Sequence, residues 1–423
     1  MDKRLTFIKL FLIVGLSALL FYKGILPAWN SIHSDFANYY VSAKLISAGL
    51  DAPEKLYDND WFQSKINEYG IKTRGKFAPF PPLTAFVMLP LSSFDPITAQ
   101  RIFTVLNLLA LGLGIFVLKK VTQWPREYVM LSWLLLGWGL TNNIAFGQLY
   151  LVIAVGILIV FRWLTNNWTL PAGLILGFFV VLKYFPVVFS FSFFLIGWLE
   201  YREETPFRKN KYLNLSFYTL ATIIVLFIFQ TLFFGKLVMT EFVRTTFIPH
   251  LNGELRGQGP FSFEFQSWDS LLRNLFVMDA EQNPNPWINW PAGKSIFKIA
   301  IAAGAALITT VTLFRFRKSR FRNQIFISLP SLAALVLLPA SATYHFVFLL
   351  PSLVLLMNEV LLNLKDKIII ALIVLMIGLI PYHFAFELAK SWGVVFAYPR
   401  LGLITILFLW IVTILNKHET ELA

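Results

Sequence analysis

LTFIKLFLIVGLSALLFY, residues 5–22, is the stretch that decides the fold class, because an apolar run of this length suits a helix that crosses a bilayer. Comparable runs recur through a chain of 423 residues, of which 57% are hydrophobic and only 14% are charged. Backbone groups in lipid have to hydrogen bond within their own segment, which helices achieve. The short alternating strands of a membrane barrel do not occur in the sequence. The chain is therefore expected to be all-α, a polytopic bundle of transmembrane helices.

Basic residues cluster in the short connections between the apolar runs, and the positive-inside rule assigns these connections to the cytoplasm. The charged start Asp2-Lys3-Arg4 indicates that residues 5–22 are a retained signal anchor with a cytoplasmic N-terminus. This assignment predicts about twelve spanning helices and a cytoplasmic C-terminus, hence a multi-pass protein of the cell membrane. The other spans are expected near residues 102–118, 127–142, 147–163, 168–182, 184–200, 213–234, 294–315, 323–338, 343–361, 367–386 and 397–415.

Two long connections fall outside the membrane in this arrangement, and residues 1–423 form one membrane domain. The first, residues 27–98, is expected to carry interfacial helices near 39–46 and 61–69 and a short proline-led helix near 84–91. The second covers residues 235–292.

The formal net charge of +13 follows from the basic connections, so it indicates orientation in a membrane and no nucleic-acid partner. Nucleotide-binding loops are missing from the sequence. The absence of cysteine excludes disulfides and thiolate metal sites.

Asp35 stands about a dozen residues beyond the first apolar run, where a lipid-linked substrate presents its head group. Because Ser34 and Asp35 precede an expected helix, one interpretation is simply a helix N-cap. The other is a catalytic carboxylate. A carboxylate beside apolar surface has a raised proton affinity, which suits a base that takes a proton from a sugar hydroxyl.

Other polar residues also fall on the expected outer side. Lys183 is expected at an outer helix end. Its side chain either extends to the membrane interface with no further role, or binds a phosphate through its positive charge. His345 is either hydrogen bonded to backbone or part of a site. Gln266 and Arg273 share a helical face with Asp269, which also fits a surface ion pair. Gln148 follows a glycine and is a turn residue by default, with sugar binding as the alternative.

Several short motifs occur in an order that resembles glycosyltransferase family 87, within the GT-C class of enzymes that use polyprenyl-phosphate sugars. The motifs are Ser34-Asp35-Phe36 with Tyr39-Tyr40, Phe80-Pro81-Pro82-Leu83, Gly147-Gln148, Lys183-Tyr184-Phe185-Pro186, Gln266-Ser267 with Leu271-Leu272-Arg273, and Pro339 with His345. Each motif is short, and it is their order over most of the chain that makes the resemblance specific.

The resemblance implies an inverting hexosyltransferase with a GT-C-like fold and an extracytoplasmic active site. Asp35 is then the general base on an acceptor hydroxyl, whose oxygen attacks the anomeric carbon of a β-linked polyprenyl-phosphate sugar, with mannose the expected sugar. Cations stabilise the departing phosphate. No metal and no other cofactor is expected; the partners are the donor, a lipid or glycan acceptor and membrane lipids. The implied substrate-binding residues are Lys183, His345, Gln266, Arg273, Gln148, Tyr39 and Tyr40.

Two other functions compete with this interpretation. A transporter or flippase of a lipid-linked saccharide is expected to carry ionisable residues near the bilayer midplane and paired broken helices. Here the versatile side chains gather in the outer segments, which favours an enzyme. A GT-C ligase or polymerase that uses a pyrophosphate-linked glycan is expected to carry more basic residues in one large outer loop.

Overall fold

The computed structural model describes the chain over residues 3–50, 52–202, 206–251, 253–254, 259–359, 362–381 and 391–417. Every regular element in these ranges is a helix, and the Asp279–Asn283 bridge is the β-type pairing recorded among them. The chain divides into two compact units, which are described separately. Unit 1 comprises Met1–Leu134 and Leu140–Gly257, and unit 2 comprises Leu135–Gly139 and Gln258–Ala423.

Unit 1 holds the helices from the first half of the chain. They are α1 (Lys3–Leu20), η1 (Phe21–Ile25), α2 (Leu26–Asn30), α3 (Ser34–Ser47), η2 (Pro53–Lys55), α4 (Asn59–Glu68), α5 (Pro82–Met88), η3 (Leu89–Ser93), α6 (Pro96–Thr122), α7 (Arg126–Leu134), α9 (Tyr150–Thr165), α10 (Thr169–Leu182), α11 (Val187–Arg202), η4 (Phe207–Lys209), α12 (Lys211–Glu241), η5 (Phe242–Phe247) and α13 (Ile248–Leu251). The helix α8 (Trp138–Ala145) starts in the short unit 2 segment and continues into unit 1.

Unit 2 holds the remaining helices. They are α14 (Trp268–Phe276), α15 (Pro291–Arg315), α16 (Arg322–Leu337), η6 (Thr343–Phe348), α17 (Leu349–Glu359), α18 (Leu364–Leu379), η8 (Ser391–Ala397) and α19 (Pro399–Lys417). Within this unit α16 packs against α17 and α19, and α14 packs against α15.

Five helical segments among the described residues are long and apolar enough to cross a membrane. They are Phe7–Ser47, Pro96–Thr122, Lys211–Leu251, Pro291–Arg315 and Pro399–Lys417. A sixth arises if α8 and α9, bent by 117°, count as one span. The structure therefore supports a multi-pass membrane protein with five or six candidate spans. The expected total of about twelve stays a prediction, because helices such as α10 and α16 are apolar but shorter.

Most apolar runs predicted from sequence correspond to a helix, but a turn at residues 135–137 divides the expected span 127–142 into α7 and α8. The ends of two expected runs, residues 360–361 and 382–386, lie outside the described residues. Another difference is in α12, which continues past the expected end at residue 234 into the predicted outer loop. At that point Gly235 has a φ of 84°, a left-handed value that breaks the helical conformation while the helix resumes beyond it. The expected loop 235–292 thus begins as helix.

Local sequence sets the ends of the two long helices of unit 1. Asp95 caps α6 by accepting a hydrogen bond from the Thr98 backbone N–H, and Lys119 and Lys120 occupy its last turn. The Asn210 side chain likewise accepts hydrogen bonds from the backbone N–H groups of Tyr212 and Leu213 at the start of α12. Between these long helices α9 packs against α6, and α10 packs against both α9 and α12.

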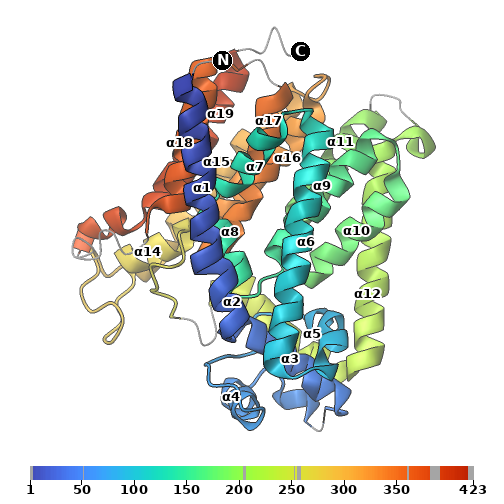
Figure 1. The fold of residues 1–423 in the computed structure, drawn as a ribbon, viewed down its shortest axis with the longest axis vertical. Helices are drawn as coiled ribbons and strands as arrows, with labels where there is room; N and C mark the ends of the chain where they lie inside the picture. The colour runs from blue at the N-terminus through green and yellow to red at the C-terminus, as the bar shows by residue number, and fades with distance from the viewer. Residues whose placement is uncertain are drawn as a thin grey trace. The chain divides into compact units, whose positions relative to one another are not determined.

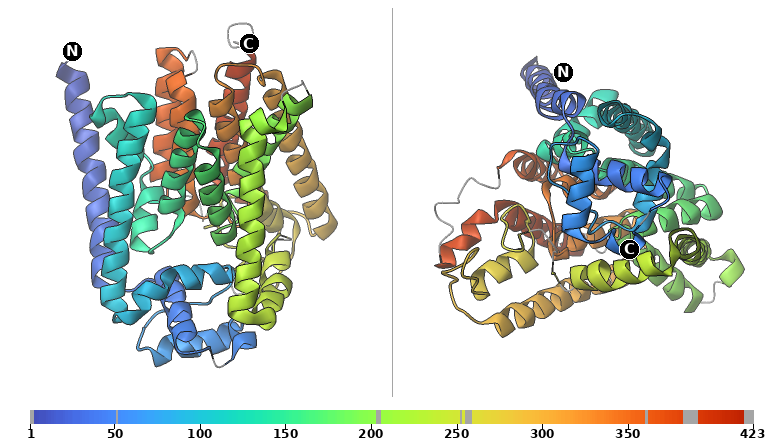
Figure 2. Two further views of the ribbon diagram at one scale, coloured as in Figure 1. Left: turned by 90° about the vertical axis from the view of Figure 1, so that its right-hand side faces the viewer. Right: turned by 90° about the horizontal axis from the view of Figure 1, so that it is seen from below.

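The short helices α3, α4 and α5 gather at one end of unit 1 (Figure 1), where α3 packs against α4, α5 and α6. Figure 2 shows the same segments at the end of the unit opposite the chain's N-terminus. The α3 helix was expected to lie at the membrane interface, but nine of its residues are buried inside unit 1. This packing makes α3 a rigid support for the residues in its first turns.

Candidate functional site

Asp35 is the second residue of α3, which follows the N-cap residue His33 with its extended backbone. The residue itself is half-buried, whereas the following residues Phe36 and Ala37 are 0% exposed. The backbone of Asp35 is therefore fixed by the packing of the rest of its helix. The Asp35 side chain is then the part of the residue that contacts other polar groups.

Gln148 links the Asp35 carboxylate to Tyr39, one helical turn further along α3. The Tyr39 hydroxyl donates to Gln148 Oε1 at 2.8 Å, and the Gln148 side chain makes a hydrogen bond to Asp35. The amide is 1% exposed, so both of its ends are used inside the protein. Gly147 allows this approach: its φ is +68°, and a Cβ there would lie 2.8 Å from the Phe36 Cβ. The predicted residues Asp35, Tyr39 and Gln148 are thus brought together.

Lys183 also faces this carboxylate, from the residue that follows the end of α10. Its ammonium lies 3.8 Å from the centre of the Phe80 ring, 5.0 Å from Tyr150 and 5.2 Å from Tyr39. Aromatic faces attract a cation, and the attraction grows when water is excluded. The side chain is 4% exposed, and the three rings hold its charge beside Asp35.

Lys76 is a second lysine whose charge acts on Asp35. The loop that carries it is fixed to α3 and α4, because the Lys76 backbone N–H donates to Asn38 Oδ1 at 2.7 Å. The Gly75 N–H donates to Gln63 Oε1 at 2.9 Å, and a Cβ on Gly75 would collide with Asn38 at 2.2 Å. His33 also acts on Asp35 and stacks on Phe146 at 3.7 Å.

The two lysines are easier to deprotonate than lysines in water. Burial lowers the pKa of Lys183 to about 7, although the Asp35 carboxylate opposes this effect. Burial likewise lowers the pKa of Lys76 to about 8, again against the influence of Asp35. A second anion in this site favours the charged form of both lysines. The arrangement therefore combines one oriented carboxylate with two lysines, which suits a hydroxyl nucleophile and a phosphate leaving group.

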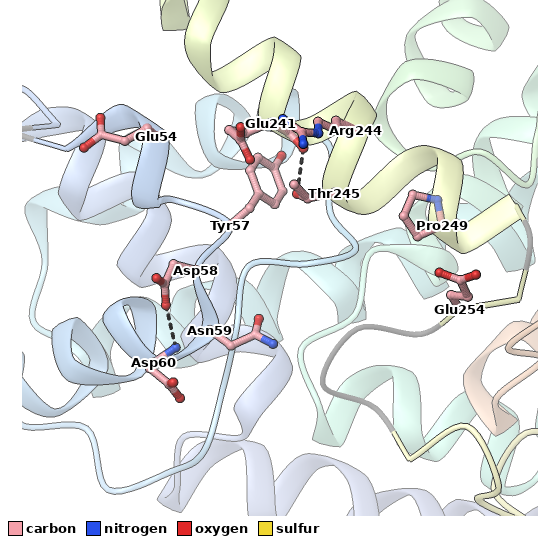
Figure 3. A pocket seen from close by; sticks show the side chains of 10 residues that line it. All are labelled: Glu54, Tyr57, Asp58, Asn59, Asp60, Glu241, Arg244, Thr245, Pro249 and Glu254. Carbon is pink, nitrogen blue, oxygen red and sulfur yellow. Dashed lines mark hydrogen bonds between the residues drawn. The ribbon is translucent and has the colours of Figure 1, made fainter.

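A cavity of about 700 Å³ opens in unit 1. Figure 3 shows that its walls come from two stretches, residues 54–60 and residues 241–254. Five carboxylates line it with one arginine: Glu54, Asp58, Asp60, Glu241, Glu254 and Arg244. Tyr57 connects the cavity to the lysine site, since its hydroxyl donates at 2.8 Å to the carbonyl oxygen of Phe80, whose ring lies under Lys183. Carboxylates accept hydrogen bonds from sugar hydroxyls. Among the described residues no group of three acidic or imidazole side chains is placed to hold a metal ion.

Three of the four remaining predicted substrate-binding residues belong to unit 2. The Gln266 amide donates to the carbonyls of Phe263 and Ala397 and accepts from the Arg400 N–H, so it ties its loop to the start of α19. His345 is 7% exposed, and its Nδ1 accepts a hydrogen bond from the Ala342 N–H at 3.0 Å. Neutral His345 therefore carries its proton on Nε2. Arg273 pairs with Asp269, with Nη2 and Oδ2 at 3.7 Å.

The model of glycosyltransferase family 87 matches residues 77–339, which is more than half of the chain. The protein belongs to glycosyltransferase family 87. No curated protein matches the chain, and no solved structure matches it.

Membership of family 87 makes the protein a glycosyltransferase, an enzyme with a sugar donor and an acceptor. The matched region includes the predicted substrate-binding residues Gln148, Lys183, Gln266 and Arg273. Asp35 and His345 lie outside it, so their assignment depends on the geometry described above.

The family 87 structure also brings forward residues that the sequence analysis did not select. The sequence does not predict the position of Lys76, because nothing in it places the loop before Phe77 against α3. The only local indication is a glycine-lysine pair in an expected outer loop. Arg400 is 1% exposed, and its guanidinium donates to the Thr343 hydroxyl. Gln100 is 0% exposed and both of its amide atoms are buried without a hydrogen-bond partner.

Tyr40 lies next to Tyr39 in sequence but faces another part of unit 1. Its hydroxyl donates to the Phe94 carbonyl at 2.8 Å, and its ring stacks on Phe36. Its predicted role in substrate binding stays a prediction.

Proposed function

We propose that the protein is an inverting hexosyltransferase that moves a hexose, with mannose the expected sugar, from a polyprenyl phosphate to a lipid or glycan acceptor. The observation that carries this proposal is the Asp35 carboxylate, held by Gln148 and faced by Lys183 and Lys76. A single carboxylate with two nearby cations suits a reaction in which a base is needed and the leaving group is already an anion.

In the proposed reaction Asp35 takes the proton of an acceptor hydroxyl. The acceptor oxygen forms a bond to the anomeric carbon while the bond from that carbon to the phosphate oxygen breaks. The electron pair of the broken bond stays on the polyprenyl phosphate, whose charge Lys183 and Lys76 stabilise. Attack from the face opposite the leaving group converts a β-linked donor into an α-linked product. Within unit 1, the acidic cavity beside Tyr57 offers room for the hydroxyls of the acceptor.

The predicted roles of His345 and Gln266 in substrate binding are retained as proposals for unit 2. The backbone hydrogen bond to Nδ1 of His345 orients the ring, so that Nε2 is the atom for a phosphate or hydroxyl. Gln266 acts through the position of Arg400, to whose backbone it is bound.

The test of the reaction is transfer of radiolabelled mannose from polyprenyl-phosphate-mannose by the purified protein in lipid. The product should be released by an α-specific glycosidase and resist a β-specific one. Asp35→Asn should lower transfer by about 10²–10⁴-fold while binding of the donor persists. Asp95→Asn is the matched control, because Asp95 is an exposed carboxylate and asparagine caps a helix as well as aspartate does. Full activity of a folded Asp35→Asn protein would show that the base is another group. Transfer only from a pyrophosphate-linked glycan would favour a ligase or polymerase instead.

We also propose that the shorter apolar helices complete a bundle of about twelve crossings, with both termini cytoplasmic and Asp35 outside. The chain contains no cysteine, so single cysteines can be introduced without removing others. In intact cells a membrane-impermeant maleimide should label Lys72→Cys and spare Lys318→Cys until the membrane is opened. Labelling in the reverse pattern would invert the proposed orientation.

A further inference from the structure

Unit 2 contains a group of charged side chains that the proposed reaction does not use. Asp269, in the first turn of α14, is 3% exposed and is contacted by three cations. Lys298 Nζ lies 2.8 Å and Lys294 Nζ 3.1 Å from the same oxygen, Oδ1, while Arg273 Nη2 lies 3.7 Å from Oδ2. The single carboxylate therefore faces three positive charges. Lys294 and Lys298 share one oxygen of one carboxylate, so an additional anion would balance their charge.

The lysines of this group are placed at one end of a candidate membrane span. Lys294 and Lys298 lie in the first turns of α15, which begins at Pro291. Their side chains are 11% and 28% exposed, respectively, so both remain accessible at the surface of the unit. Lysines at the end of a spanning helix reach towards the lipid head groups.

An aromatic group surrounds the same helix end. Phe276 contacts Trp287, Trp290 and Phe297, with ring centres 5.4–6.2 Å apart. The two tryptophans are nevertheless 49% and 43% exposed, and Phe297 is 41% exposed. Tryptophan is enriched where a membrane protein meets the head-group region. The N–H of Trp290 donates to the Phe276 carbonyl at 2.9 Å, which holds these rings beside the charged group.

We propose that Arg273, Lys294 and Lys298 bind the phosphate of an anionic membrane phospholipid, whose acyl chains lie along Trp287, Trp290 and Phe297. The charge favours an anion, and the exposed rings at the start of a spanning helix favour one that carries apolar chains. A bulk phospholipid fits an open site of this kind at the end of a spanning helix. This inference is independent of the reaction proposed for Asp35.

The probes are dioleoyl phosphatidylglycerol and dioleoyl phosphatidylcholine, which share acyl chains and differ in net charge. Native mass spectrometry of the full-length protein, titrated with each lipid, should show preferential binding of phosphatidylglycerol. The double variant Lys294→Gln/Lys298→Gln should weaken binding of phosphatidylglycerol by about tenfold and leave that of phosphatidylcholine unchanged. Lys236→Gln is the matched control, since Lys236 is an exposed lysine in another candidate span and should change neither.

A second variant separates lipid binding from a purely structural role of the lysines. Asp269→Asn removes the competing anion, so phosphatidylglycerol should bind as tightly as before or more tightly. If the lysines serve only to neutralise Asp269, neither the double variant nor Asp269→Asn will change the preference between the two lipids, and the proposal fails. Binding of polyprenyl phosphate without binding of phosphatidylglycerol would also overturn it, because the site would then belong to the donor.

Discussion

Asp35 and Asp269 are two aspartates in similar local positions with different surroundings. Each lies in the first turn of a short helix, and each faces more than one cation. Asp269 makes direct ion pairs with two lysines at 2.8 and 3.1 Å. Asp35 instead accepts a hydrogen bond from the neutral amide of Gln148, and the charges of Lys183 and Lys76 act on it. Asp35 is therefore the one suited to accept a proton, and Asp269 the one suited to organise charge.

The strongest test of this comparison applies the same substitution to both residues. Asp35→Asn should lower the rate of sugar transfer by about 10²–10⁴-fold, because a general base contributes that much. Asp269→Asn should keep transfer within about threefold of wild type and lower thermal stability instead, because it removes partly buried ion pairs. Transfer rates and thermal unfolding of both purified variants check this. If only Asp269→Asn caused a large loss of transfer, Asp269 and not Asp35 would be the base.

Lys183→Gln should have the next largest effect on transfer. It removes the cation that the three rings hold beside Asp35, and loss of one group that stabilises a developing charge costs about 10²–10³-fold in kcat. The exposed Lys236→Gln should leave kcat unchanged. The measurement is steady-state transfer at several donor concentrations. A rise in KM with an unchanged kcat would show that Lys183 binds the donor without stabilising the departing phosphate.

The lowered lysine pKa values predict how activity depends on pH. A lysine with a pKa of about 7 or 8 loses its charge when the pH rises through that value, well below the ordinary 10.5. The value of kcat/KM, which reports groups of the free enzyme, should therefore fall in two steps, near pH 7 for Lys183 and near pH 8 for Lys76. Lys76→Arg keeps its charge over this range and should remove the second step, lowering the loss between pH 7 and 9 by about tenfold. An unchanged profile would exclude Lys76 from the site.

The helices and the unit 1 site differ in how far sequence alone predicts them. Apolar runs predict helices because the backbone in lipid has no other partner. Most expected runs correspond to a helix, whereas the turn that divides the expected span 127–142 was not predicted. Asp35, Tyr39 and Gln148 were selected from sequence and are brought together. Lys76 was not, because its place depends on hydrogen bonds from its loop to Asn38 and Gln63, residues far from it in sequence. The contacts that a loop makes with distant residues produce no periodic pattern of residue types in the sequence.

The continuation of α12 past residue 234 has a related cause. A glycine after an apolar run predicts a helix end, yet the helix resumes beyond Gly235 because later residues, such as Val238 and Met239, are buried in unit 1. Tertiary packing therefore overrides the local tendency of glycine to end a helix.

The adjacent tyrosines of α3 give the smallest and most discriminating comparison. Tyr39→Phe removes the hydrogen bond that orients Gln148 against Asp35 and should lower transfer by about tenfold, because a misplaced carboxylate is a poorer base. Tyr40→Phe removes the hydrogen bond to the Phe94 carbonyl and should lower stability by about 1 kcal/mol, with transfer changed less than threefold.

Both changes delete one hydroxyl from one buried helix, so a general disturbance of α3 would affect transfer equally in the two variants. Transfer rates and thermal unfolding of the pair separate the cases. If Tyr40→Phe impairs transfer as much as Tyr39→Phe while thermal unfolding of both variants stays that of wild type, then Tyr40 takes part in substrate binding as the family resemblance implies. If only Tyr39→Phe does, the path from Tyr39 through Gln148 to Asp35 is what prepares the base, and the packing of α3 serves to keep that path in place.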